Sequence, residues 1–252
     1  MARYDFSTRR LYVDAPLAPE ARIDLDRPQA HYLCNVLRLG EGAELLAFNG
    51  RDGEWRVALS LQGRKSVALV AKKMTRPQEA GGDLHYLFAP LKHARQDYMV
   101  QKAVEMGASL LQPVLTRHTH SDRINEARMQ ANAVEAAEQC GILALPRTAS
   151  PARLDALLAA WPSERLLIFC DEDAESGEPV GTLQAAKADL AVPRPLAVLI
   201  GPEGGFDPAE RAALMAQPSV VRLSLGPRVL RADTAAVAAL ALVQAVLGDW
   251  HG

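Results

Sequence analysis

Two glycine-bearing segments in the last quarter of the chain carry the residues that could do chemistry. They are residues 199–206, LIGPEGGF, and residues 223–234, LSLGPRVLRADT. Each lies between an expected strand and an expected helix, where glycine lets backbone amides approach a ligand closely. The first segment lacks both the G-x-G-x-x-G pattern and the Lys-Ser/Thr of a phosphate loop, which disfavours a dinucleotide or ATP site. On spacing alone, both segments could also be ordinary strand-to-helix turns.

The elements around these segments predict an α/β domain over residues 83–252. Expected strands at 84–89, 110–115, 165–170, 196–200 and 220–223 alternate with expected helices at 95–106, 125–139, 154–160, 207–215 and 233–247. Asp207, Pro208 and Glu210 are typical of a capped helix start. Such alternation implies a largely parallel sheet with helices on both faces and a ligand site beyond the carboxyl ends of its strands.

The first 75 residues predict a small β-barrel with one helix. Short strands rich in Val and Leu are expected at 11–13, 43–48, 55–61 and 66–71, with glycine-containing turns between them. A helix is expected to begin near Asp26 and Pro28 and to end before Gly40. Residues 76–82 are polar and contain Pro and Gly, so we expect them to be a linker.

Charge and cysteine usage narrow the class of protein. Residues 1–79 hold 13 Lys/Arg and 10 Asp/Glu, whereas residues 80–252 hold 15 and 20, within a net charge of −2. A basic module joined to an acidic one is compatible with RNA binding by the first. The three cysteines form no C-x-x-C pair, so we expect reduced core thiols and a cytoplasmic protein. We find neither a signal peptide nor an apolar run of membrane-spanning length and expect no membrane association.

A metal site is a further possibility to weigh. His118, His120 and Asp122 are close in sequence, and two histidines on one strand face could be metal ligands. No third histidine stands nearby, so we expect no metal.

Ordered sequence blocks along nearly the whole chain resemble one known family. The blocks are residues 10–12 (RLY), 31–33 (HYL), 36–40 (VLRLG), 101–107 (QKAVEMG), 135–141 (EAAEQCG), 201–206 (GPEGGF), 225–226 (LG), 230–231 (LR) and 234–235 (TA). In this order they are similar to the ribosomal RNA small-subunit methyltransferase E family of the SPOUT superfamily.

The resemblance implies a fold, an activity and partners. The fold would be a C-terminal SPOUT-type α/β domain with a trefoil knot, preceded by a PUA-like β-barrel that assists RNA binding. The activity would be transfer of a methyl group from S-adenosylmethionine to N3 of a uridine in 16S ribosomal RNA of the small subunit. The protein would be a homodimer without a metal. Two alternatives are a knotted ribose 2′-O-methyltransferase and an RNA-binding protein without enzymatic activity.

The resemblance also places the cofactor pocket in three loops that follow strands. The expected cofactor-binding residues are Phe169, Cys170, Asp171, Ile200, Gly201, Pro202, Gly204, Gly205, Leu223, Leu225, Gly226, Leu230 and Thr234. Apolar side chains would form a slot for adenine, and the amides near the glycines would meet its polar edge. The leucines could instead be ordinary core residues.

Two residues of these loops are candidates for catalysis. Uridine N3 carries a proton, so the site must remove that proton or stabilise the anion that remains. We expect Arg231 to stabilise charge on the uracil oxygens or to hold a neighbouring phosphate. Glu203 could be the base or could orient a ligand, but Arg231 could equally form a surface ion pair and Glu203 a loop contact. Asp233, where relatives often have Glu, suits a helix cap.

Basic residues of the first domain are the expected RNA contacts, mostly to phosphates. They are Arg9, Arg10, Arg38, Arg64 and Lys65. Each could instead be a solvated surface charge. Ile142 stands where many relatives have a basic residue, which puts an RNA contact there in doubt.

Overall fold

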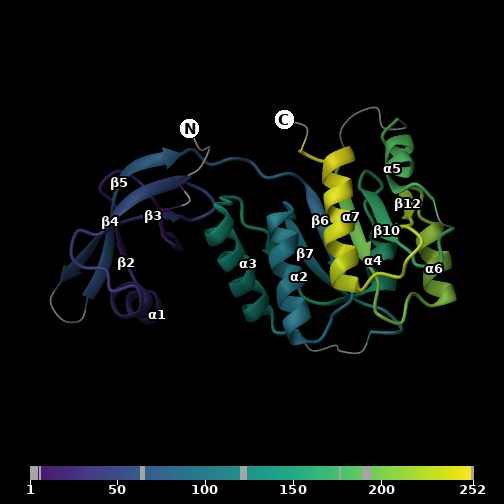
Figure 1. The fold of residues 1–252 in the computed structure, drawn as a ribbon, viewed down its shortest axis with the longest axis horizontal. Coiled ribbons are helices and arrows are strands. Elements are labelled where there is room, and N and C mark those ends of the chain that lie inside the picture. Colours follow the sequence, from purple (N-terminus) through teal and green to yellow (C-terminus); the bar gives the residue numbers. More distant parts are fainter. Residues whose placement is uncertain are drawn as a thin grey trace. The chain divides into compact units, whose positions relative to one another are not determined.

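The structure is a computed structural model that describes residues 5, 7–62, 66–119, 124–175, 177–188 and 194–250. The chain divides into two compact units (Figure 1). The first contains residues 1–80 and 137–145, and the second contains residues 81–136 and 146–252. Within the described ranges, no helix combines the length and the apolar character that crossing a membrane requires.

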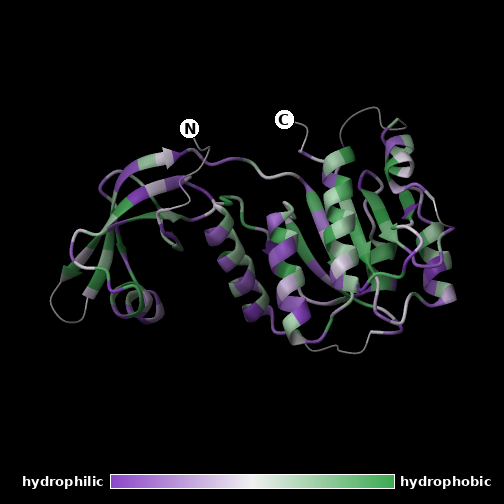
Figure 2. Ribbon diagram, viewed as in Figure 1, coloured by the Kyte–Doolittle hydropathy of each residue, from purple (hydrophilic) through white to green (hydrophobic). Residues whose placement is uncertain are grey.

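The second unit is built on a seven-stranded parallel sheet. Its strands are β6 (Leu84–Phe88), β7 (Leu110–Leu115), β8 (Arg147–Thr148), β9 (Ala152–Arg153), β10 (Leu166–Cys170), β11 (Leu196–Ile200) and β12 (Val220–Leu223). Their spatial order is β12-β10-β11-β6-β7-β8, and β9 also pairs with β7. β10 and β11 are buried along their whole length, as strands covered on both faces must be, and they are largely green in Figure 2. The predicted parallel sheet is therefore confirmed.

Helices flank this sheet. They are α2 (His93–Glu105), α3 (Glu126–Cys140, of which residues 137–140 belong to the first unit), α4 (Leu154–Ala159), α5 (Pro179–Ala188), α6 (Pro208–Met215) and α7 (Ala232–Val246). α7 packs against α2, α5 and β11, and α4 packs against α6. Phe169 and Leu199 of the sheet share a buried cluster with Leu158 of α4 and Leu214 of α6. The sequence predicted each of these helices except α5, whose apolar residues form no marked face.

The start of α6 fixes where the loop after β11 ends. The Asp207 carboxylate accepts a hydrogen bond from the backbone amide of Ala209 at 2.9 Å, and the Glu210 carboxylate accepts one from the Asp207 amide at 3.0 Å. Pro208 occupies the first turn, where its missing N–H leaves no bond unmade. This confirms the helix start that the sequence predicts.

The first unit is built on a five-stranded sheet with the order β1-β3-β4-β5-β2. Its strands are β1 (Arg10–Tyr12), β2 (Arg22–Asp24), β3 (Glu44–Phe48), β4 (Glu54–Gln62) and β5 (Ser66–Arg76). β1 runs parallel to β3, and the other pairs are antiparallel. α1 (Arg27–His31) starts at a capping box of Asp26 and Gln29 and continues into a π-helical turn, η1 (Tyr32–Val36). The sequence predicted this helical segment and four of the strands but not β2, and it ended β5 too early.

A buried ion cluster joins the strands of the first unit. The Glu54 carboxylate accepts hydrogen bonds from Arg10 Nε at 2.7 Å, from Arg76 Nη2 at 2.9 Å and from the Thr75 hydroxyl at 2.8 Å. Arg76 also donates to the Gly141 carbonyl at 2.8 Å. Arg10 is 8% exposed, so its prediction as an RNA contact is wrong: its guanidinium neutralises a buried carboxylate. Arg76 is the last residue of β5, and its guanidinium pairs with the same Glu54 carboxylate.

Removing the Glu54 carboxylate should destabilise the first unit strongly. Glu54→Ala leaves two arginines without their shared partner, and breaking a buried pair in this way costs about 3 kcal/mol. The matched control is Glu44→Ala, because Glu44 forms an exposed ion pair with Arg56 and should change the free energy of unfolding little. Chemical denaturation measures both variants, and equal stabilities would contradict the prediction.

The effect of Glu54 should also depend on pH. Burial alone would raise the pKa of Glu54, but hydrogen bonds from Arg76, Arg10 and Thr75 outweigh it and hold the pKa below the ordinary value of 4.5. Because the pKa of Glu54 is lowered in the folded state, its contribution to the free energy of unfolding is fully present above pH 4.5. This contribution is lost as the pH falls through the folded-state pKa. The stability difference between the wild type and Glu54→Ala should therefore shrink below pH 4.5.

Candidate functional site

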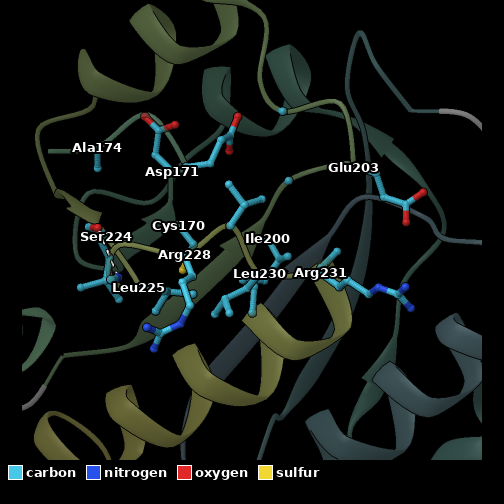
Figure 3. A pocket seen from close by; sticks show the side chains of 18 of the residues that line it. Cys170, Asp171, Ala174, Ile200, Glu203, Ser224, Leu225, Arg228, Leu230 and Arg231 are labelled. Atoms are coloured by element: carbon cyan, nitrogen blue, oxygen red, sulfur yellow. Dashed lines mark hydrogen bonds between the residues drawn. The ribbon is translucent and has the colours of Figure 1, made fainter. Parts of the chain in front are cut away.

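The candidate site is a cavity of about 580 Å³ at the carboxyl ends of β10, β11 and β12 (Figure 3). Three chain segments line it, one after each of these strands, together with the first turns of α7. The lining residues are Cys170, Asp171, Glu172, Ala174, Ile200, Gly201, Pro202, Glu203, Gly204, Gly205, Leu223, Ser224, Leu225, Gly226, Pro227, Arg228, Val229, Leu230, Arg231, Ala232 and Ala235. Because carboxyl ends of neighbouring parallel strands meet at one edge, segments far apart in sequence form one pocket.

The loop after β11 requires glycine at two positions. A Cβ on Gly201 would lie 2.7 Å from the Phe206 ring, which packs edge-on against Phe169 with ring centroids 5.6 Å apart. Gly205 has a φ of 70°, and a Cβ there would lie 2.0 Å from the Glu172 carboxylate. At these two positions the close packing leaves room for backbone only.

A histidine from the neighbouring loop holds the same segment in place. His118 Nδ1 lies 3.1 Å from the carbonyl oxygens of both Gly204 and Gly205, so a protonated Nδ1 can donate to either. The backbone amide of Arg117 donates to the Glu210 carboxylate at 2.7 Å. His118 therefore braces the glycine loop. Its two partners in the metal hypothesis, His120 and Asp122, lie outside the described residues.

Asp171 is the buried charge at the base of the pocket. Its carboxylate is fully buried and forms ion pairs with Arg211 of α6 at 3.0 Å and with Arg222 of β12 at 2.7 Å. Its backbone amide donates to the Leu223 carbonyl at 3.2 Å. Burial alone would raise the pKa of Asp171, but hydrogen bonds from the two arginines outweigh it and lower the pKa. This aspartate thus ties the end of β10 to β12 and α6.

Two further carboxylates lie next to Asp171. Ligand oxygens of Asp171, Glu172 and Asp173 all fall within 4.8 Å of one another, which is close enough to share a cation. The Arg211 guanidinium already contacts all three carboxylates, at 3.0, 3.5 and 2.9 Å respectively. The Arg211 guanidinium therefore offsets the negative charge of this cluster.

The walls of the cavity are apolar on one side. Ile200 and Leu223 are buried, and Leu225 and Leu230 are half-buried. Burial, with a smaller effect from the Asp171 charge, raises the pKa of the Cys170 thiol to about 12. Cys170 is therefore a neutral wall residue near pH 7.

The two candidate catalytic residues sit at the rim. Glu203 forms an ion pair with Arg95 in the first turn of α2, a partner that its sequence position did not reveal. Arg231 is the N-cap residue of α7 and is exposed, and its guanidinium forms no hydrogen bond or ion pair with another described residue. Figure 3 shows its guanidinium on the same side of the view as Glu203, away from Asp171 and Ser224. Arg231 is thus available to a ligand, whereas Glu203 is engaged.

The structure brings together most of the residues that the sequence selected for the pocket, but not all. Phe169 is fully buried against Phe206 and Thr234 is exposed, and neither lines the cavity. Three lining residues fell outside the selected segments, namely Glu172, Ala174 and Ala235. Their signal was only their position, either directly after the strand that ends at Cys170 or in the first turn of the last helix.

The expected RNA contacts of the first unit have different environments. Arg9 and Arg38 are exposed, and Arg38 has a φ of 56°, which is uncommon for a residue with a side chain. Arg64 and Lys65 lie outside the described residues. Arg10 belongs to the buried cluster, which leaves Arg9 and Arg38 as candidates within the described part of this unit.

Comparison with known families and relatives gives consistent results over nearly the whole chain. A family described as the RNA methyltransferase domain matches residues 78–244, and one described as the RNA methyltransferase PUA domain matches residues 25–72. A ribosomal RNA small subunit methyltransferase E from Synechocystis is 31% identical, covering 94% of this chain and 78% of the relative. The protein of the same name from Rickettsia conorii is 25% identical, covering 93% and 94%.

Solved structures share the fold of both units. A putative methyltransferase from Legionella pneumophila, solved with the bound cofactor SAM, has a TM-score of 0.79 and 27% identity, covering 94% of this chain and 97% of its own. A ribosomal RNA small subunit methyltransferase E from Neisseria gonorrhoeae, solved with S-adenosyl methionine, has a TM-score of 0.81 and 23% identity, covering 96% and 99%. The second likeness shows the fold, which is α/β with a PUA-like N-terminal unit.

Asp171 should matter more for the pocket than its acidic neighbours. Asp171→Ala leaves Arg211 and Arg222 without their buried partner, so we expect a loss of about 3 kcal/mol in the free energy of unfolding. Asp173→Ala is the matched control, because the Asp173 side chain is 65% exposed and has one ion pair to the same Arg211. Denaturation of the two variants tests this, and a larger loss for Asp173→Ala would contradict it.

Proposed function

Because the chain belongs to the ribosomal RNA small-subunit methyltransferase E family, we propose that it methylates N3 of a uridine in 16S ribosomal RNA, with S-adenosylmethionine as methyl donor. The single observation that carries this proposal is the cavity formed by three segments at the strand ends. The Legionella relative at 27% identity was solved with its cofactor SAM bound, which supports the same donor here.

The residues of the cavity fit the proposed donor. Ile200, Leu223, Leu225 and Leu230 offer apolar walls for an adenine ring, while the backbone of the glycine loop offers donors and acceptors for its edge. Gly205 has a φ of 70°, which residues with side chains rarely adopt, so glycine keeps the backbone of the loop open to the ligand here. When bound, the donor supplies a methyl group already activated on a sulfonium.

The proposed chemistry assigns a task to each rim residue. The N3–C bond forms as the sulfur–carbon bond breaks, and N3 must give up its proton. Arg231 places a positive charge where the uracil oxygens gain negative charge as that proton leaves. Glu203 accepts the proton, and Arg95 holds its carboxylate at the rim until the RNA enters. Since N3 is paired in a duplex, the target uridine must be unpaired or displaced.

The first unit is proposed to hold the RNA. Arg9 and Arg38 are exposed and can contact phosphates, and we assign the same task to Arg64 and Lys65. Tyr32 of η1 is 40% exposed near Arg38 in sequence and can stack on an unpaired base. π-helical turns occur often at functional sites, which supports this placement.

The resemblance further supports proposals on the oligomeric state, the path of the chain and the cellular location. We propose a homodimer, and Val229 at the pocket rim, which is 89% exposed, is an apolar side chain that a second copy could cover. We propose that the segments lining the pocket follow the knotted path of the family. We also propose that the enzyme acts in the cytoplasm, where its ribosomal RNA substrate is found.

The proposed reaction can be tested directly. Purified protein, S-adenosylmethionine and small-subunit RNA from cells lacking this gene should give 3-methyluridine in digested RNA, measured by mass spectrometry. Calorimetry with S-adenosylmethionine should show binding to the folded protein. If the digested RNA instead contains methylated ribose, the activity is 2′-O-methylation. If the folded protein does not bind the donor, RNA binding without methyl transfer is the remaining function.

Loss of the Arg231 guanidinium should slow the chemical step. Arg231→Ala should lower kcat by about 100-fold, the usual effect of removing one group that stabilises charge in the transition state. Binding of S-adenosylmethionine should change little. Arg147→Ala is the control, because Arg147 is exposed on β8 and does not line the cavity. Equal kcat values for the two variants would remove Arg231 from the mechanism.

A further inference from the structure

A second cavity of about 660 Å³ lies in the same unit, beyond the end of β6. Its lining comes from the segment between β6 and α2, from the first turns of α2 and from the first turns of α3. The cavity is separate from the methyl-donor pocket and shares no lining residue with it. The proposed methylation assigns no task to it.

The floor of the second cavity is apolar. Leu91 is 7% exposed, Val100 is fully buried and Met129 is 2% exposed, and Ile124 is half-buried beside them. A methionine in such a floor adapts to flat ligands and makes favourable contacts with aromatic rings. A floor of this kind favours the face of a ring over a compact, strongly hydrated ion.

The charges at its side are already compensated. The Asp97 carboxylate accepts hydrogen bonds from Arg128 Nε at 3.0 Å and from Asn132 Nδ2 at 2.7 Å. Lys92 and Glu126 remain at the rim with opposite charges. The cavity therefore has little net charge, which disfavours a bare phosphate as its main ligand and favours a neutral group with a polar edge.

One polar side chain of the lining has hydrogen-bonding capacity to spare. Gln96 is half-buried, and its side-chain amide makes no hydrogen bond with another described residue. Its amide offers both a donor and an acceptor, which is the pattern that pairs with the polar edge of a nucleobase. Gln96 directly follows Arg95, which forms the ion pair with Glu203 at the rim of the donor pocket. The first turn of α2 therefore contacts the glycine loop and lines the second cavity.

From this juxtaposition we propose that the second cavity is a nucleobase subsite, which captures an unpaired base flanking the target uridine of the RNA. The apolar floor stacks on the base, Gln96 bonds its edge, and Lys92 at the rim meets the backbone phosphate. Capture of a neighbouring base offsets the cost of opening the RNA around the target, since a stacked base contributes a favourable binding term. This inference rests on the proposed RNA methylation.

Gln96→Ala tests the subsite in the full-length enzyme. We expect the KM for RNA to rise roughly tenfold, the effect of losing one base contact, with kcat and the affinity for S-adenosylmethionine nearly unchanged. Gln184→Ala is the matched control, because Gln184 is an exposed helical glutamine on α5 that lines neither cavity. Thermal melting confirms that both variants fold. A KM for RNA equal to that of the control would overturn the proposal.

A second experiment identifies the ligand. Binding is measured with a 16S RNA fragment that contains the target uridine, with each flanking nucleotide replaced in turn by an abasic one. One position should weaken wild-type binding roughly tenfold and should not weaken Gln96→Ala further. If every abasic position affects both proteins equally, or if free nucleosides fill the cavity without competing with RNA, the subsite is not for RNA. A wild type that methylates no RNA at all would instead contradict the proposed function.

Discussion

The pocket of this protein depends on one buried carboxylate. Asp171 sits at the end of a fully buried strand, where an unpaired charge would be very costly, and Arg211 and Arg222 reach it from α6 and β12. The backbone of Asp171 bonds Leu223 at the same place. Two of the three segments that line the cavity are thereby tied to each other.

The third segment is held by close packing and hydrogen bonds, together with the ion pair between Glu203 and Arg95. Phe206 packs over Gly201, Glu172 packs over Gly205, and His118 bonds the carbonyls of the loop from outside. Each contact removes freedom from the backbone that faces the cavity, so the loop is ordered by the fold itself. Preorganisation of this kind is what a methyl-transfer site needs, because donor and acceptor must be held in line. At the rim, the exposed Arg231 is available to a ligand, whereas Glu203 is held in an ion pair with Arg95.

The first unit also contains a buried carboxylate that is paired with two arginines. Arg10, Glu54 and Arg76 form a buried cluster that binds β1, β4 and β5 together and reaches the carbonyl of Gly141. Arg10 and Arg9 are neighbours in sequence, yet one is buried and the other exposed. Arg10 is the first residue of β1, whereas Arg9 lies just before the strand, so adjacent arginines have different environments.

The sequence by itself determined most of the secondary structure around the site, though not α5, as well as the parallel order of strands and helices and the two glycine loops. These features are local, because apolar periodicity, caps such as Asp207 and glycine turns act within a few residues. Only the tertiary structure decided which charges meet: Asp171 with Arg211 and Arg222, Glu203 with Arg95, and Arg10 with Glu54. It also removed Phe169 from the cavity lining and opened a second cavity at Gln96. Partners separated by tens of residues leave no pattern in one sequence, since only the folded arrangement of strands, helices and loops brings them together.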